Sequence, residues 1–94
     1  MQLDLSPQAA ADIEEIGDYI AVDNPIAADM LVDRLYAEIS LIVSRPLLFR
    51  FAEGLNAVRS ARVGRYRILF RTQGDVVRIE RVVHGMRDLS KAIL

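Results

Sequence analysis

The second half of this 94-residue chain contains a segment in which arginine and apolar residues alternate. Side chains of a strand point to opposite faces in turn, so this period-2 pattern predicts strands with one apolar face and one arginine-bearing face. We therefore predict three consecutive strands between Gly54 and Asp88. The arginines of this segment are Arg59, Arg62, Arg65, Arg67, Arg71, Arg78, Arg81 and Arg87.

The length and the residue types limit what this arginine face can belong to. A chain of 94 residues buries roughly two thirds of its unfolded surface, which predicts a single domain over residues 1–94 with one two-layer core. Cysteine is absent, which excludes disulfides, thiolate zinc sites and cysteine nucleophiles. His84 is the single histidine, which excludes a multi-histidine metal site. The sequence predicts neither a metal nor a cofactor.

The apolar residues do not form a membrane span. No run approaches the roughly 18 apolar residues that a transmembrane helix needs. The first residues, MQLDLSPQ, lack the basic segment followed by an apolar segment that marks a secretory signal. We therefore expect a soluble, cytoplasmic protein with no membrane partner.

The net charge of −1 conceals two halves of opposite sign. Up to Pro46, nine acidic residues stand against two arginines, a balance of −7. Beyond Pro46, four acidic residues stand against nine arginines and one lysine, a balance of +6. This asymmetry indicates an anionic partner for the second half. The alternative is that acidic residues of the first half neutralise the arginines within the molecule.

Two proline-containing signals divide the first half into helices. The alternating residues 2–5 predict a short strand, after which Ser6 and Pro7 provide an N-cap and a first helical residue. Apolar residues at helical spacing predict a helix over residues 7–22, in which Gly17 indicates close packing against a neighbour. Asp23, Asn24 and Pro25 repeat the signal and start a second helix that ends before Pro46. Such a short connection predicts an antiparallel hairpin, and the whole chain an α+β fold of two layers.

The segment from Pro46 to Asn56 is predicted to be a loop, with Gly54 as a turn residue. It is apolar for a loop, which favours packing of its large side chains on the helices over contact with a partner. Those side chains are Leu47, Leu48, Phe49 and Phe51.

A tight turn at Gln73 and Gly74 sets a register for the last two strands. Phe70 would then face Val77, and Ile68 would face Ile79 on the core side. The same register places Arg67 opposite Glu80 and Arg65 opposite Val82. Arg81 falls on the apolar side, so it must lie at an edge or reach a helix carboxylate. Beyond Asp88, residues 89–94 are expected to form one helical turn or a flexible tail.

Four stretches together resemble a known family. They are LSPQAAADIEEIGDYIA, NPIAADMLVDRL, VGRYRILFR and RVVHGMRDL, in this order along the chain. They resemble the ParE branch of the RelE/ParE toxins of bacterial type II toxin–antitoxin modules. The resemblance covers nearly the whole chain and includes the predicted element order β-α-α-β-β-β. It also implies a cognate antitoxin, an acidic or amphipathic segment of which would lie on the arginine face or add a strand to a sheet edge.

RelE-like members of this superfamily cleave messenger RNA on the ribosome without a metal. This resemblance gives Arg67 a role at the phosphate, because it matches an arginine that those enzymes use there. His84 is the candidate acid or base, since only histidine titrates near neutrality when unperturbed. A lone histidine is more often structural, however, and the chain ends in DLSKAIL instead of a basic or tyrosine-bearing tail.

ParE-like members inhibit DNA gyrase by binding, and His84, Gly85, Arg87 and Asp88 resemble that branch. The resemblance therefore favours a gyrase inhibitor that is not an enzyme over a ribonuclease, with an inactive, antitoxin-binding relative as a third alternative. Direct binding of nucleic acid is less favoured. The residues expected to bind antitoxin or target are Arg59, Arg62, Arg65, Arg67, Arg71, Arg78 and Arg87, together with the C-terminal segment.

Overall fold

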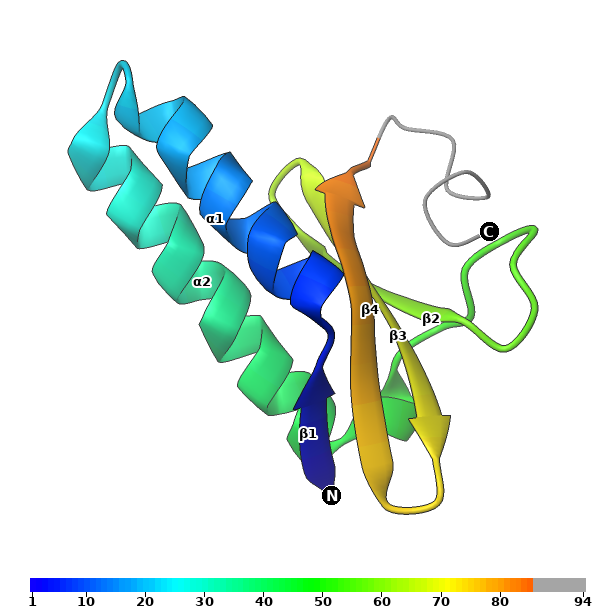
Figure 1. Ribbon diagram of the computed structural model, residues 1–94. Coiled ribbons are helices and arrows are strands. Elements are labelled where there is room, and N and C mark those ends of the chain that lie inside the picture. Colours follow the sequence, from blue (N-terminus) through cyan, green and yellow to red (C-terminus); the bar gives the residue numbers. More distant parts are fainter. Residues whose placement is uncertain (86–94) are drawn as a thin grey trace.

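The computed structural model describes residues 1–85, and its elements follow the predicted order (Figure 1). Arg87 and the predicted segment 89–94 lie outside the described residues. The elements are β1 (Gln2–Leu5), α1 (Pro7–Ala21), α2 (Pro25–Ser44), the 3₁₀ helix η1 (Pro46–Leu48), β2 (Arg59–Val63), β3 (Tyr66–Gln73) and β4 (Val76–His84).

Both helices begin at the predicted caps. The Ser6 hydroxyl accepts a hydrogen bond from the Ala9 amide at 2.9 Å, and the Asn24 side chain accepts one from the Ala27 amide at 3.0 Å. In each case a proline takes the first helical position, where a missing N–H costs nothing. Helix α1 ends at Ala21, one residue earlier than predicted.

The two helices form the expected antiparallel hairpin, and Gly17 lies at their contact (Figure 1). A Cβ added to Gly17 would lie 3.1 Å from Cγ2 of Val32 on α2. This distance is tighter than an ordinary van der Waals contact, so the glycine permits the close approach that its position in the helix indicated.

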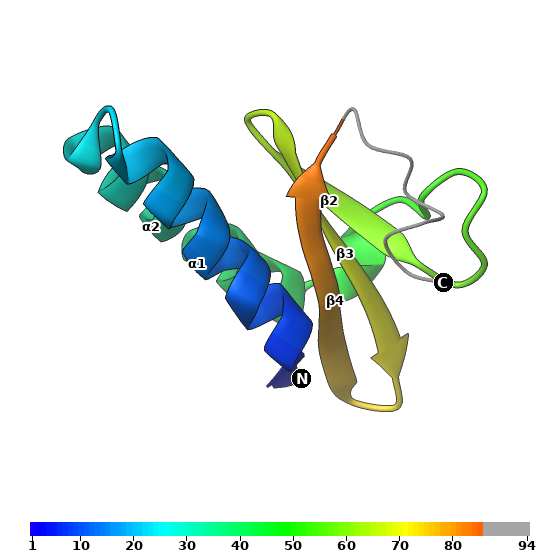
Figure 2. The ribbon, with the colours of Figure 1, turned by 45° about the horizontal axis from the view of Figure 1, so that its top comes forward.

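The hairpin covers one face of a four-stranded sheet of order β1-β4-β3-β2 (Figure 2). The last three strands form the predicted antiparallel meander, whereas β1 pairs in parallel with β4 because the helical hairpin connects it to the rest of the sheet. The main core lies between these layers. Its buried residues are Ala9, Ile13, Leu35, Ile39, Ile42, Ala61, Val63, Ile68, Phe70, Val77, Ile79 and Val82.

The loop before β2 covers part of the opposite face of the sheet. Its backbone runs back along β2, with a hydrogen bond of 3.0 Å from the Ser60 amide to the Arg50 carbonyl and one of 2.7 Å from the Ala52 amide to the Val58 carbonyl. A second buried cluster results on this face, formed by Ala52, Val58, Leu69 and Val83 with Leu55 packed against it.

The predicted packing of the apolar loop residues is wrong for three of the four side chains. Phe49 packs on the core, where its ring meets Phe70 edge-on at 5.7 Å between centroids. Leu47, Leu48 and Phe51 are instead 71%, 72% and 57% exposed, because the 3₁₀ turn η1 and the return along β2 direct them outward.

The predicted register of β3 and β4 is also wrong. The two-residue turn is Gly74–Asp75, one residue later than expected, with Gly74 at φ 59° and Gln73 paired with Val76. Phe70 therefore faces Ile79, not Val77. A turn shifted by one residue moves every cross-strand pair by two positions, which the alternation of apolar and polar residues does not reveal.

A bulge shifts the pairing once more within β4. Phe70 pairs with Ile79 but Leu69 pairs with Arg81, so Glu80 is the extra residue. After it, Ile68 pairs with Val82. The bulge reverses the alternation of β4, which buries Val82 on the helix side and Val83 on the opposite side.

These changes overturn two expected arginine positions. Arg67 faces Val83, not Glu80, and the Glu80 carboxylate instead accepts from Arg78 at 2.8 Å. Arg65 lies with Gly64 in the two-residue turn between β2 and β3, not opposite Val82.

Candidate partner-binding site

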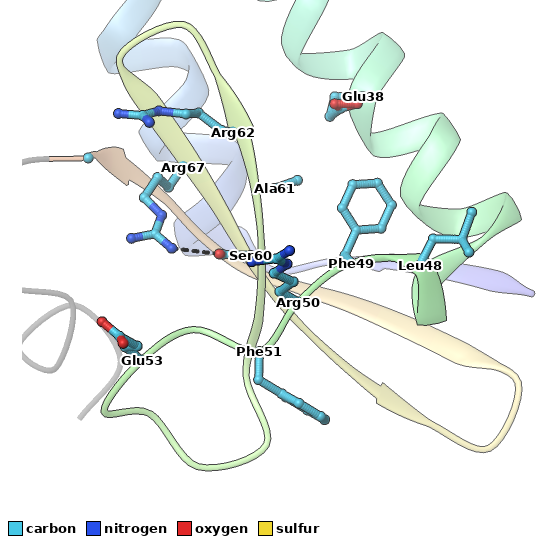
Figure 3. A pocket seen from close by; sticks show the side chains of 11 residues that line it. Glu38, Leu48, Phe49, Arg50, Phe51, Glu53, Ser60, Ala61, Arg62 and Arg67 are labelled. Carbon is cyan, nitrogen blue, oxygen red and sulfur yellow. Dashed lines mark hydrogen bonds between the residues drawn. The ribbon is translucent and has the colours of Figure 1, made fainter.

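An open cleft straddles β2, the edge strand of the sheet (Figure 3). Three arginines line it: Arg62 and Arg67 lie on the side of β2 away from the core, and Arg50 lies on the loop that runs along the strand. We call this group the arginine cluster. The complete lining consists of Glu38, Leu48, Phe49, Arg50, Phe51, Glu53, Ser60, Ala61, Arg62, Arg67 and Gly85.

Strand geometry brings two of these arginines together. Arg62 on β2 and Arg67 on β3 are direct cross-strand partners. They lie on the face opposite the helices, because their neighbours Ala61, Val63 and Ile68 belong to the main core. Two like charges directly opposite each other in a sheet are unfavourable, so this pair favours an anion above it.

Ser60 orients Arg67 towards the edge of the sheet. The Arg67 guanidinium donates to the Ser60 hydroxyl through Nη2 at 2.7 Å (Figure 3). Both side chains are half-buried, and this neutral acceptor fixes the guanidinium without neutralising it. The arrangement keeps the remaining donors of Arg67 available for a ligand.

The arginine cluster has no ion pair within residues 1–85. The ion pairs of this part of the chain join Arg78 to Asp4 and Glu80, and Arg81 to Asp12. Glu38 and Glu53 line the cleft, but neither carboxylate lies within 4.0 Å of Arg50, Arg62 or Arg67. A carboxylate or a phosphate from a partner would supply the missing charge.

Two other predicted binding arginines have structural contacts instead. Arg59 donates to the Phe49 carbonyl at 2.6 Å, and its guanidinium lies 3.9 Å from the centre of the Phe51 ring. It thus holds the loop before β2. Arg78 pairs with Asp4 at 2.6 Å, and this hydrogen bond, before any other cause, raises the pKa of Arg78 above its ordinary value.

The remaining predicted arginines lie apart from the cleft or outside the described chain. Arg65 is exposed in the turn between β2 and β3, and Arg71 is exposed on β3 opposite Arg78. Neither lines the cleft, and Arg87 is not among the described residues. The structure therefore brings together Arg62 and Arg67 from the predicted set and adds Arg50.

His84 and Arg67, the two residues of the ribonuclease alternative, lie on opposite faces of the sheet. The His84 ring packs edge-on against Tyr66, its cross-strand partner, with 5.7 Å between centroids. It lines a depression with Glu15 and Tyr19 of α1. A catalytic site on the arginine face could not use this imidazole, because the sheet separates it from Arg67.

The bulge in β4 is held by α1 through Asp12, which is 5% exposed. Its carboxylate accepts from Arg81 at 2.8 Å and 3.1 Å and from the Val82 amide at 2.9 Å. The hydrogen bond from Arg81 to Asp12 raises the pKa of Arg81 against the opposing effect of burial. This confirms that Arg81 reaches a helix carboxylate.

Sequence reasoning missed Asp12 and Arg50. A signal for Asp12 existed, since Asp12 lies next to Ile13 of the apolar stripe and Arg81 was expected to reach a helix carboxylate. Arg50 gave no comparable signal, because its position depends on the return of the loop along β2.

Residues 1–85 contain neither a cluster of metal ligands nor a membrane-spanning helix. This part of the chain has no cluster of His, Asp and Glu that could hold a metal ion. It also has no helix with the length and apolar character that crossing a bilayer requires.

Comparison with known families gives a match over nearly the whole chain. The family model described as "ParE toxin of type II toxin-antitoxin system, parDE" matches residues 3–89. The chain belongs to the ParE toxin family. No curated protein sequence matches it.

Solved structures share the fold of this ParE family member. One is described as the chromosomal ParDE toxin–antitoxin system from P. aeruginosa, with a TM-score of 0.80, 22% identity, and coverage of 89% of this chain and 95% of that chain. Another is the toxin–antitoxin complex RelBE2 from Mycobacterium tuberculosis, with a TM-score of 0.58, 24% identity, and coverage of 88% and 95%.

Proposed function

We propose that this protein is the toxin of a type II toxin–antitoxin module that inhibits bacterial growth by binding DNA gyrase in the cytoplasm. A cognate antitoxin holds it inactive until the antitoxin is lost. The match of the ParE family model over residues 3–89 supports the toxin role, and the arginine cluster supports an acidic protein partner.

The position of His84 on the face of the sheet opposite Arg67 is the observation that favours gyrase binding over RNA cleavage. A metal-independent ribonuclease needs a base, an acid and cations around one phosphate. The arginine cluster could supply the cations, but His84 lies across the sheet. Among the described residues that line the cleft, the acid and base would have to come from Glu38 and Glu53.

Purified gyrase provides the direct test. We expect the toxin to inhibit supercoiling and to accumulate cleaved DNA in the presence of gyrase. The double variant Arg62→Gln, Arg67→Gln should lose at least tenfold in potency, since a hydrogen bond to a charged group is worth about 1.5–3 kcal/mol. Arg45→Gln is the matched control, because Arg45 is exposed and does not line the cleft.

Folded toxin that neither inhibits supercoiling nor accumulates cleaved DNA would exclude gyrase as the target. Induction in bacteria then distinguishes the alternatives, because a gyrase poison causes filamentation and a DNA-damage response. Rapid arrest of translation with cleaved transcripts would instead identify the ribonuclease.

A further inference from the structure

The depression lined by His84 lies between α1 and the end of β4, across the sheet from the arginine cluster. It forms where α1 diverges from β4, towards the C-terminal end of the helix (Figure 2). Its volume is about 270 Å³, below the range of about 300–1,000 Å³ that pockets for drug-sized ligands occupy. It therefore has room for one side chain of a partner. We call it the α1–β4 depression.

Aromatic rings from three elements line the α1–β4 depression. Tyr19 belongs to α1, Tyr66 begins β3 and His84 ends β4. The rings of Tyr66 and His84 meet edge-on, with 5.7 Å between their centroids. Tyr19 is 79% exposed, so the solvent reaches its ring from outside the molecule. Aromatic rings attract cations through their faces, and a partner's cation placed here would lie among these rings.

Glu15 adds a negative charge to the same depression. It precedes Tyr19 by four residues on α1, and side chains at this spacing lie on the same side of a helix. Within residues 1–85, no ion pair includes Glu15. The neighbouring ion pair of Asp12 and Arg81 has no net charge. With His84 neutral, the depression therefore carries the net charge of the Glu15 carboxylate.

We propose that the α1–β4 depression binds the guanidinium of an arginine side chain that the target protein, gyrase, inserts between α1 and β4. The Glu15 carboxylate pairs with this cation, and the rings of Tyr19 and Tyr66 contact it. Arginine fits better than lysine, because its planar, weakly hydrated cation stacks on aromatic faces. The identity of the partner rests on the proposed function.

Other occupants fit the depression less well. An apolar side chain would desolvate the Glu15 carboxylate without supplying a partner for it. A carboxylate would be repelled by Glu15, so an acidic segment of the antitoxin suits the arginine cluster and not this face. An exposed carboxylate or tyrosine alone would be an ordinary solvated side chain. Here both stand on one side of α1, against a second tyrosine, and this combination is complementary to a cation.

Two exposed residues of α1 test the site in the complete toxin. We expect Glu15→Gln and Tyr19→Ala each to raise the Kd for purified gyrase about tenfold, because each removes one attraction for the cation. The Kd for the antitoxin, the protein encoded beside the toxin gene, should stay within about twofold. Circular dichroism checks that both variants fold.

Matched controls exist for both substitutions. Glu14 is an exposed carboxylate of α1, and Tyr36 is a 44% exposed tyrosine of α2; neither lines the depression. Glu14→Gln and Tyr36→Ala should leave the Kd for gyrase within about twofold. A general effect of surface charge or of tyrosine removal would appear in these controls as well.

A small probe tests the cation site without gyrase. N-acetylarginine amide should bind the wild-type toxin weakly and shift the ring signals of Tyr19 and Tyr66 in NMR titrations. The neutral isostere N-acetylcitrulline amide should not shift them, since it lacks the charge that Glu15 and the rings attract. Glu15→Gln should weaken the binding of the arginine probe at least threefold.

The outcomes separate the site from the proposed function. Loss of gyrase affinity in Glu15→Gln and Tyr19→Ala, with unchanged controls, supports the site. Unchanged gyrase affinity in both variants overturns it and leaves gyrase as the target, whereas loss of antitoxin affinity in place of gyrase affinity overturns the assignment to the target. If wild-type toxin does not bind gyrase, the proposed function and the gyrase assignment both fall. The probe then decides on the cation site alone, and equal effects of the arginine and citrulline probes overturn it.

Discussion

The carboxylate of a single residue, Asp12, connects the helical layer to the bulge of β4. Its carboxylate receives Arg81 and the Val82 amide, and it is almost fully buried. A buried ion pair adds little compared with an apolar pair, but removing one partner leaves the other charge uncompensated. The Val82 amide would also lose its acceptor.

Asp12→Ala should therefore lower the free energy of unfolding by about 3 kcal/mol, measured by urea denaturation. Glu14→Ala is the matched control, because Glu14 is an exposed carboxylate on the same helix, and it should change stability by less than about 0.5 kcal/mol. Equal losses for the two variants would contradict the role of Asp12 at the bulge.

The N-cap residues of the two helices differ in the contacts that they make. Ser6 accepts from the Ala9 amide and also donates its hydroxyl proton to the Glu80 carbonyl at 2.8 Å, so the start of α1 is fixed to the bulge. Asn24 only caps α2 and is exposed. One cap is thus a tertiary contact, whereas the other is local.

We expect Ser6→Ala to cost about 2 kcal/mol and Asn24→Ala about 1 kcal/mol of unfolding free energy. The difference arises from the Glu80 carbonyl, which loses its donor only in the first variant. Thermal unfolding of both variants side by side measures it. A larger loss for Asn24→Ala would rule out this coupling of cap and bulge.

The helical hairpin depends on the contact between Gly17 and Val32. Alanine is favoured over glycine inside a helix by about 1 kcal/mol, but the added Cβ would crowd the Val32 side chain at 3.1 Å. Gly17→Ala should gain about 1 kcal/mol in a Val32→Ala background and clearly less in the wild type. A double-mutant cycle by urea unfolding measures this coupling, and equal gains in both backgrounds would exclude it.

In the molecule as a whole, the helical layer carries most of the acidic residues and the sheet carries most of the arginines. Of the acidic residues on the helices, only Asp12 forms an ion pair with a described arginine of the sheet. The charge of Arg81 is therefore neutralised by a helix carboxylate, and the charge of Arg78 is neutralised by Asp4 and Glu80. The arginine cluster retains its charge, which would attract an acidic partner over a distance.

Association with the antitoxin should accordingly depend on salt. We expect the association rate constant to fall about tenfold when ionic strength rises from about 0.05 M to about 0.5 M, because screening shortens the range of the attraction. The double variant Arg62→Gln, Arg67→Gln should show a weaker dependence in stopped-flow measurements. The same salt dependence in both proteins would place the attraction elsewhere.

Local patterns in the sequence determined the elements of this fold. Ser6 with Pro7 and Asn24 with Pro25 start the helices by capping chemistry that acts within one turn, and alternation marks the three strands of the second half. The order of elements and the two-layer architecture followed from these signals. Gly17 likewise indicated the close contact of the helices.

Only the tertiary structure decided which residues meet at the candidate site. The turn at Gly74 and the bulge at Glu80 set the register of β4, and the bulge is fixed by Ser6 and Asp12 from a distant part of the chain. Arg50 joins the arginine cluster only because the loop returns along β2. The sequence by itself determined a sheet with one arginine-bearing face. Long-range hydrogen bonds, which no local pattern encodes, determined that Arg50 joins Arg62 and Arg67 and that His84 lies on the other side of the sheet.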